Sequence, residues 1–286
     1  MTRSRAGKAK KGIARFLNYA LLVFVALIFI LPIMTLVFGS FKTDENQLLM
    51  DMSSFRAFLP VGELGTENFS DVFGRIDVLN YLKNSVIITA CSAFFGIVLN
   101  SMLGYVLARF TFRGRRAILK TIISLMIIPM EAIAMPLLLI CFKMSLINTL
   151  TVQILPFLID PFTIFFFYQG FLKLPVEMEE AALIDGCSYP KIYRSIAMPL
   201  SKPTVISVLI LCSMGKWGDV FWPNMVTRGR EVRPLSIGLT QLYQALPRDW
   251  GDIFAFALIM TIPIMAVFFI FQKQFMESVA TTGIKG

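Results

Sequence analysis

Six long apolar stretches constrain the fold of this chain more than any other feature of its sequence. Each is close to the ~20 residues that a helix needs to cross a lipid bilayer. They lie at roughly 17–40, 84–108, 117–141, 150–172, 201–222 and 251–272. With 286 residues, of which 56% are hydrophobic, the composition is that of a polytopic membrane protein rather than a soluble domain. The sequence therefore predicts an all-α membrane protein with six transmembrane helices.

The distribution of Lys and Arg predicts the orientation of these helices. The first fifteen residues carry basic residues and no acidic one, and the connector at 109–116 is also basic without an acid. The loop 41–83 is the reverse, because acidic residues outnumber basic ones there. We expect both termini in the cytoplasm, with 41–83 and 223–250 outside. Topology then explains the net charge of +9, and nucleic acid is not expected as a partner.

A polar segment between the fourth and fifth stretches carries the most specific pattern, EAALIDGCSYPKIYRSIAMP at 180–199. Good helix formers fill 176–184, and Gly186 suits a helix stop. The acidic residues come early in this helix, where its dipole favours negative charge. A second short helix is expected over 187–196, with Ser188 as its N-cap and Pro190 in its first turn.

The spacing within this segment resembles the cytoplasmic coupling loop of ABC-importer permeases. In that family, EAA is followed after three residues by Gly and after nine more by Ile-x-Leu-Pro. The matching residues are Glu180, Ala181, Ala182, Gly186, Ile196 and Pro199, with Met198 in place of the usual leucine. Further stretches resemble the MalG-like branch of the binding-protein-dependent carbohydrate importers: 40–42, 84–85, 108–110, 217–223 and 283–286. The branch more often has Asn at the position of Gly218.

The resemblance implies the type I ABC importer permease fold, in one transmembrane domain over 1–286. Its parts are a basic N-terminus at 1–16, a six-helix core at 17–275 with the EAA loop at 174–200, and a cytoplasmic tail at 276–286. Residues 278–286 of this tail are expected to reach into the ATPase pair. The loop residues that couple to the ATPase are Glu180, Ala181, Ala182, Asp185, Gly186, Ile196 and Pro199. The resemblance also implies a multi-pass protein of a bacterial or archaeal cytoplasmic membrane.

The implied partners are a second, MalF-like permease chain, two ATPase subunits, an extracytoplasmic sugar-binding protein and membrane lipid. The chain itself has no phosphate-binding GxxxxGK[ST] motif, so ATP and Mg are expected on the ATPase subunits, with no cofactor and no catalysis here. The four cysteines lack metal-site spacing and histidine is absent, so no metal site is expected either. The expected function is sugar or oligosaccharide import by alternating access.

Ionisable residues inside apolar stretches usually face protein or a wet cavity. Asp160 lies between Pro156 and Pro161, in a stretch that proline must distort, so it either lines a water-accessible path or marks a membrane interface. Near the end of the fifth stretch are Trp217, Asp219 and Trp222. These three form either an interfacial aromatic belt or the outer mouth of a sugar path.

The outer loop 223–250 carries Arg228, Arg230 and Arg233, which runs against the usual excess of basic residues on the inner side. Acidic lipid headgroups or the acidic rim of a docking protein would account for this group. The family resemblance favours docking of the binding protein.

Three other functions compete with sugar import. An ABC importer for glycerol phosphate or a polyamine would carry the same coupling segment. An ion-coupled secondary transporter would need inverted repeats and ionisable residues coupled at the midplane, and it would leave the EAA segment unexplained. A membrane scaffold that transports nothing would also leave the EAA segment unexplained.

Overall fold

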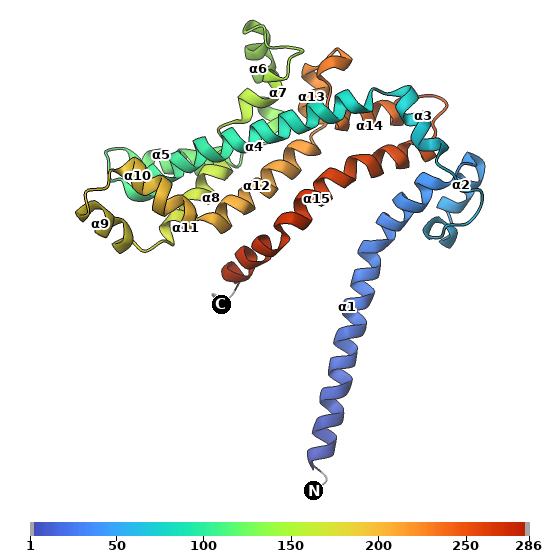
Figure 1. Cartoon of the computed structure of the whole chain (residues 1–286), viewed down its shortest axis with the longest axis horizontal. Coiled ribbons are helices and arrows are strands. Elements are labelled where there is room, and N and C mark those ends of the chain that lie inside the picture. The colour runs from blue at the N-terminus through green and yellow to red at the C-terminus, as the bar shows by residue number, and fades with distance from the viewer. Residues whose placement is uncertain (1–2, 284–286) are drawn as a thin grey trace. The chain divides into compact units, whose positions relative to one another are not determined.

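The computed structural model describes the backbone of residues 3–283 and the side chains of residues 15–273. Over 3–283 the chain forms helices and no strand, with an isolated bridge between Lys42 and Leu64 (Figure 1). The chain divides into two compact units. The first is Met1–Ile76 with Gln241–Ile259, and the second is Asp77–Thr240 with Met260–Gly286. The side chains of the C-terminal tail expected at 276–286 lie outside the described residues.

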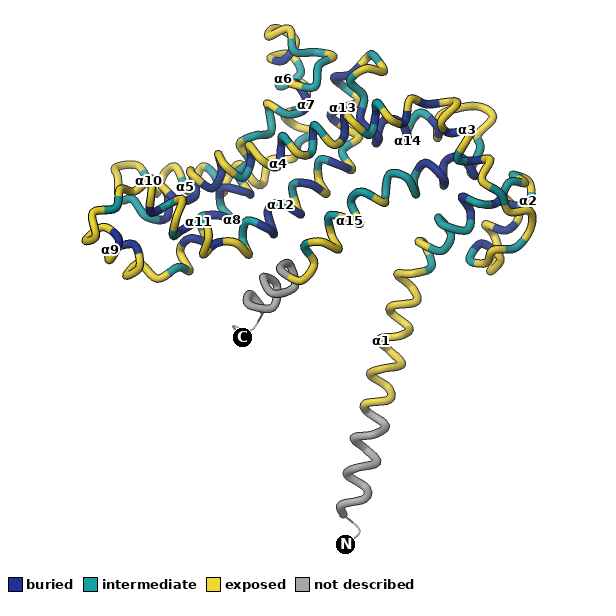
Figure 2. The backbone as a smooth tube through the Cα atoms, in the orientation of Figure 1, coloured by how far each residue is buried: buried dark blue, intermediate teal, exposed yellow. Residues whose placement is uncertain are grey.

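The first unit begins with the long helix α1, Arg3–Phe41. Its part Arg15–Phe41 has a mean hydropathy of 3.0 and contains an apolar window in which no residue is buried (Figure 2). This helix is the first expected span, and it is long enough to cross a bilayer. The unit continues with α2 at Glu45–Met52, the 3₁₀ helix η1 at Phe55–Phe58 and α3 at Glu67–Arg75.

The end of α1 is fixed to the start of the last helix, α15 at Trp250–Gly283. Gly39 lies so close to the ring of Phe254 that any side chain at this position would overlap it. The amide of Asn68 on α3 donates to the carbonyls of Ser40 and Lys42, at 3.0 and 2.9 Å. Side-chain hydrogen bonds thus replace the helical bonds that α1 lacks at its end.

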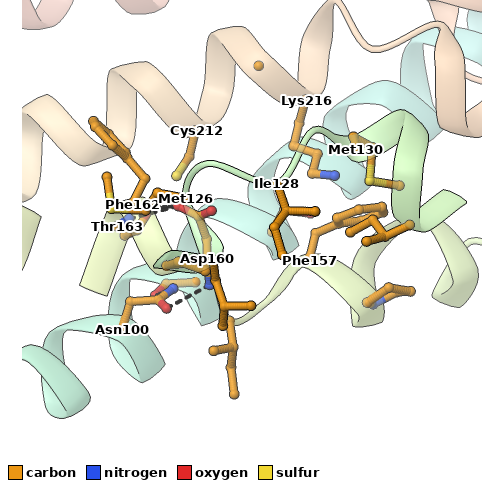
Figure 3. Close-up of a pocket in the computed structure, with 18 of the residues that line it drawn as sticks. Asn100, Met126, Ile128, Met130, Phe157, Asp160, Phe162, Thr163, Cys212 and Lys216 are labelled. Carbon is orange, nitrogen blue, oxygen red and sulfur yellow. Dashed lines mark hydrogen bonds between the residues drawn. The ribbon is translucent and has the colours of Figure 1, made fainter. Parts of the chain in front are cut away.

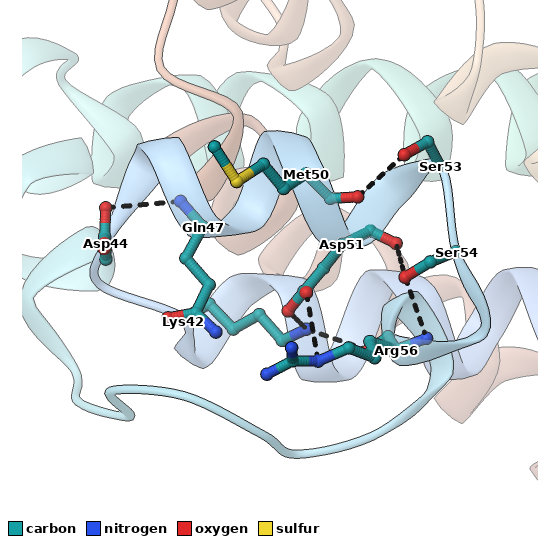
Figure 4. Close-up of polar contacts among 8 residues, drawn as sticks. All are labelled: Lys42, Asp44, Gln47, Met50, Asp51, Ser53, Ser54 and Arg56. Carbon is teal, nitrogen blue, oxygen red and sulfur yellow. Dashed lines mark hydrogen bonds and ion pairs between the residues drawn. The ribbon is translucent and has the colours of Figure 1, made fainter.

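A buried ion pair holds α2 and η1 against the end of α1 (Figure 4). Lys42 Nζ lies 2.7 Å from Asp51 Oδ2 and donates to the carbonyl of Arg56 at 2.9 Å. The guanidinium of Arg56 contacts the other carboxylate oxygen of Asp51 at 3.3 Å. Burial of both charges is tolerated because each is paired and hydrogen-bonded.

The second unit is organised around α4, Val78–Arg109, which packs against α8, Pro161–Leu172, and α12, Lys202–Trp217 (Figure 1). At Gly104 the two backbones of α4 and α8 come close. A Cβ there would stand 2.9 Å from the backbone nitrogen of Tyr168, so the contact requires glycine. A core cluster joins these helices: Tyr105, Ala108, Phe167, Phe171, Ala197 and Val208.

The remaining helices of this unit are short. They are α5 at Arg115–Leu125, α6 at Met130–Lys143, α7 at Thr151–Ile154, η2 at Leu155–Phe157, α9 at Glu177–Ile184, α10 at Tyr189–Ile192, the π-helix η3 at Tyr193–Ala197, α11 at Met198–Leu200, α13 at Phe221–Val226 and η4 at Arg230–Val232. Helix α14, Leu235–Gln244, crosses from the second unit into the first.

Three helices in the described chain are each long and apolar enough to span a membrane: α1, α4 and α15. Three further pairs qualify only when a bent pair is taken as one span. The bends are 103° between α5 and α6, 46° between α7–η2 and α8, and 77° between α10–α11 and α12.

Proline explains where two of these bends fall. Pro129 precedes α6, and Pro161 opens α8 directly after the break at Asp160. Proline has no N–H to donate and disfavours helical geometry in the residue before it. The expected stretch 117–141 is therefore two helices at a sharp angle rather than one straight span. The expected stretch 201–222 ends its helix at Trp217, and α13 follows after a turn.

We predict that Asp51→Ala destabilises the first unit strongly, because it leaves the buried Lys42 without its closest counter-charge. Breaking a buried ion pair from one side costs about 3–5 kcal/mol. The check is thermal unfolding of the purified chain in detergent, with Glu63→Ala as control because that carboxylate is exposed. Equal unfolding temperatures for the two variants would show that the ion pair between Lys42 and Asp51 does not stabilise the first unit.

Candidate functional site

The EAA segment folds as two short helices joined by a glycine turn. Helix α9 ends at Ile184, and Gly186 adopts φ +79°, in the left-handed region that glycine favours. The amide of Cys187 donates to the carbonyl of Ala182 at 2.9 Å, and that of Gly186 donates to Leu183 at 3.0 Å. These two bonds make a Schellman cap, which satisfies the last carbonyls of α9. The predicted helix stop at Gly186 is thus present, and α10 begins after Ser188 as expected.

The residues of the segment divide into an exposed and a buried set. Exposed are Glu180, Ala181, Asp185, Gly186 and Pro199, while Ala182 is buried and Ile196 is half-buried. Ile184 is 87% exposed and Met178 is 46% exposed on the same helix. Glu180 and Ala181 precede Ile184 by four and three residues, so these three exposed residues lie on one face of α9, where another protein could contact them.

Glu179 is the residue of this segment that sequence reasoning missed. It lies next to the motif glutamate but points inward, where Oε1 accepts from Arg109 Nε at 2.7 Å and Oε2 accepts from the Tyr105 hydroxyl at 2.9 Å. The sequence did hold a signal, since Glu179 and Ala182 are three residues apart and share one helix face. Arg109 lies in the basic connector 109–116 and in the family-like stretch 108–110, but neither pattern predicts its pairing with Glu179.

A cavity of about 770 Å³ lies in the second unit where α4, α6, α8 and α12 meet (Figure 3). Most of its lining is apolar. Its polar members are Ser92, Asn100, Asp160, Thr163, Cys212 and Lys216. A cavity of this size, mostly apolar with a few polar groups, has the character of a small-molecule site.

Asp160 lines this cavity at the break before α8, where it caps the helix. Its Oδ2 accepts from Thr163 N at 2.7 Å and from the Thr163 hydroxyl at 2.5 Å. The side chain of Asn100 reaches across from α4, accepting from Asp160 N at 2.9 Å and donating to Leu158 O at 2.8 Å. The carboxylate is therefore held in place and contributes to the shape of the wall.

Lys216 is the only cation among the described residues that line the cavity. Its Nζ stands 3.6 Å from the centre of the Phe157 ring, a cation–π contact. Figure 3 shows the lysine reaching from its helix toward Phe157 and Ile128. An ammonium and an aromatic ring at one point are groups that can hold a polar ligand.

The other residues suggested for a substrate path lie outside the lining of this cavity. Trp222 is 1% exposed, and its indole N–H donates to Val152 O at 2.8 Å. The indole of Trp217 donates to Met260 O at 2.9 Å. Asp219 accepts from the backbone of Trp222 at 3.3 Å, so it caps α13. The structure thus brings Asp160 and Lys216 to one cavity and gives Trp217, Asp219 and Trp222 packing and capping contacts.

The loop that carries Arg228, Arg230 and Arg233 is held in place by hydrogen bonds to its backbone. Asn84 donates to the carbonyls of Glu231 and Arg233 at 2.7 and 3.0 Å, and Asn148 accepts from the amides of Arg228 and Gly229. The side chains of Arg228 and Arg230 are exposed, whereas that of Arg233 is half-buried. Two of the three arginines are therefore presented on a fixed loop.

These features together define a helical membrane protein with an internal cavity and an exposed helix–turn–helix between spans, the organisation of a transport permease. A profile of the family described as "Binding-protein-dependent transport system inner membrane component" matches residues 100–280. The chain belongs to this family. Its members form the membrane component of a transporter and are not enzymes.

Individual proteins extend the similarity over nearly the whole chain. The arabinooligosaccharides transport system permease protein AraQ of Halalkalibacterium halodurans is 31% identical, covering 92% of this chain and 94% of that protein. The diacetylchitobiose uptake system permease protein NgcG of Streptomyces coelicolor is 29% identical, covering 92% and 87%. A chain in the crystal structure of a bacterial ABC transporter for the acidic polysaccharide alginate superposes with a TM-score of 0.80 at 22% identity, covering 92% of this chain and 96% of that chain. The fold is that of a type I ABC importer permease.

We predict that Gly186→Ala distorts the turn between α9 and α10, because a Cβ in left-handed geometry costs about 1–2 kcal/mol, and that it thereby weakens the expected binding of the EAA segment to an ATPase subunit. Gly186→Asn should lose less, since asparagine tolerates this conformation. The check is the amount of ATPase subunit that copurifies with each variant at matched membrane levels. Gly74→Ala is the control, because its surroundings are open and its φ is not positive. Equal copurification in all three variants would show that the turn is not needed.

Proposed function

We propose that this chain is the permease subunit of an ATP-driven, binding-protein-dependent importer of a sugar or oligosaccharide. The exposed face of α9, with Glu180 and Ala181 outward beside Ile184, is the observation that carries the proposal. The names of AraQ and NgcG support the sugar substrate, because the first names a transport system for arabinooligosaccharides and the second an uptake system for diacetylchitobiose.

The proposed complex has a second, MalF-like permease, two ATPase subunits that bind ATP and Mg, and an extracytoplasmic sugar-binding protein. The chain crosses a bacterial or archaeal cytoplasmic membrane six times, counting each bent pair as one span, with both termini inside. Residues 1–16 and 276–286 are then cytoplasmic ends of one permease domain, and 174–200 is the loop that meets the ATPase. Positive charge at 1–15 and 109–116 supports this orientation.

In the proposed mechanism, ATP binding closes the ATPase pair and moves α9 as a rigid body. The spans then rock from inward- to outward-facing, so that the cavity opens toward the binding protein and can take up the sugar that it releases. Lys216 and Phe157 would then contact the sugar in transit. ATP hydrolysis occurs on the ATPase subunits, and this chain provides the path.

The function is tested by reconstituting the chain with its second permease, ATPase and binding protein in proteoliposomes. The expected result is ATP-dependent uptake of labelled oligosaccharide and ATPase activity stimulated by the loaded binding protein. Uptake of glycerol phosphate or a polyamine instead would overturn the sugar assignment. Uptake without ATP would overturn the assignment to ATP-driven importers.

We predict that Glu180→Lys abolishes the stimulation of ATPase activity by the loaded binding protein, while the protein still inserts in the membrane. Losing one partner of a hydrogen-bonded charge pair at an interface costs about 2–5 kcal/mol, more than tenfold in affinity. Glu67→Lys is the control, since this exposed glutamate also opens a helix but lies outside the EAA segment. Normal stimulation in the Glu180 variant would remove this residue from the coupling site.

We also predict that the double replacement of Arg228 and Arg230 by Ser weakens docking of the binding protein at low ionic strength. Exposed charges at an interface mainly steer association, and salt screens them. Basal ATPase activity should stay unchanged. The measurement is the association rate of the binding protein with the reconstituted complex, at low and at physiological salt.

Its matched control replaces Arg113 and Arg116, which are exposed on the connector expected inside. The docking assignment is wrong if both double variants associate at the rate of the unmodified complex in low salt.

A further inference from the structure

The glutamate next to the motif forms the centre of a buried polar cluster between α9 and α4. We define the α4–α9 cluster as Tyr105, Arg109 and Glu179. Both oxygens of the Glu179 carboxylate are engaged, one by the Arg109 guanidinium at 2.7 Å and the other by the Tyr105 hydroxyl at 2.9 Å. Arg109 also donates to Leu174 O at 3.0 Å, just ahead of α9. The coupling helix and the chain entering it are therefore held to the end of α4 by charge-assisted bonds.

The second half of the EAA segment is fastened to the same helix. The hydroxyls of Tyr193 and Ser101 share a hydrogen bond of 2.7 Å, and the ring of Tyr193 lies 5.3 Å from that of Tyr105. Ser101, Tyr105 and Arg109 follow one another at intervals of four, so they occupy one face of α4. Both halves of the EAA segment are therefore attached to this single face of α4.

Helix α4 continues from this face to the wall of the cavity. Asn100, adjacent to Ser101, holds both Leu158 O and Asp160 N at the break before α8. Arg109 and Asn100 are nine residues apart on an unbroken helix, about 14 Å along its axis. A rigid helix thus has polar attachments to the coupling segment at one end and to the cavity wall further along.

We propose that the α4–α9 cluster is a positioning device that makes α9 and α4 move together, so that displacement of the coupling helix reaches the cavity. This inference rests on the proposed function. Apolar packing of Ala182 alone would let α9 slide or tilt against α4, whereas a carboxylate with two directional donors fixes its position. Glu179, Arg109 and Tyr105 act through other residues and need not touch substrate or ATPase.

The test separates positioning from simple stabilisation. The variant Glu179→Leu leaves Arg109 buried and unpaired, so it would lose stability for trivial reasons. The double variant Arg109→Met/Glu179→Leu removes both charges, and apolar replacement of a buried pair is often neutral for folding. The readout is the number of sugar molecules transported per ATP hydrolysed in the reconstituted complex.

We expect the double variant to unfold near the temperature of the unmodified complex, to retain its ATPase subunits and to hydrolyse ATP. Its transport per ATP should fall by about fivefold or more, as expected for a lost coupling free energy. The matched control is Lys42→Met/Asp51→Leu, which removes a buried ion pair far from the coupling segment in sequence and should keep the ratio unchanged. An unchanged ratio in the cluster variant would show that the pair only stabilises, and would overturn the proposal.

If the double variant does not fold, Tyr105→Phe provides the same test, since it removes one donor and keeps the ring contacts with Phe171 and Tyr193. A lowered transport ratio at unchanged stability supports positioning, and an unchanged ratio contradicts it. Failure of the proposed function would look different, because the unmodified complex itself would then show no uptake.

Discussion

The side chain of Asn100 bridges a break in a membrane-spanning segment of the second unit. Where the span at 151–172 breaks, Leu158 O and Asp160 N lose their helical partners, and hydrocarbon offers no replacement. One amide group satisfies both, and it also donates to Gly96 O within its own helix at 2.6 Å. The bend before α8, the orientation of Asp160 and the cavity beside them all depend on this bridge.

The close contact of α4 and α8 at Gly104 has a similar effect. A Cβ at Gly104 would stand 2.7 Å from the Cβ of Phe167 and 2.9 Å from the backbone nitrogen of Tyr168, so the two helices pack there with no side chain between their backbones. Helix α4 is therefore positioned by a steric contact and by polar bridges on either side of it. A helix held in this way can transmit a displacement over its length instead of absorbing it.

Local chemistry explains which features were predictable from the sequence. The apolar stretches, the turn at Gly186 and the distortion near Pro161 depend on residues close in the chain. In the described residues the structure contains this turn and this distortion, and three single helices long and apolar enough to span a membrane. The burial of Glu179 was not predictable, because its partner Arg109 is seventy positions away and both are charged groups usually found on a surface. The position of the Lys216 ammonium was not predictable either, because it depends on a contact with the ring of Phe157, which is distant in the sequence.

The role of Trp222, near the end of the fifth apolar stretch, was likewise not predictable from nearby residues. An aromatic residue there suits a membrane interface or a sugar path equally well from composition alone. What determines the role of Trp222 is a carbonyl at Val152 that accepts its indole N–H inside a packed cluster. No local pattern around Trp222 encodes that carbonyl.

The Schellman cap of α9 has a consequence for how such a transporter can diversify. Backbone bonds and one glycine shape the turn, while Glu179 and Ala182 anchor the helix from beneath. The outward residues, among them Glu180, Ala181 and Ile184, contribute little to that shape and can change without refolding the segment. We expect that grafting these few outward positions from one permease onto another transfers the choice of ATPase subunit, while the fold of the segment stays the same.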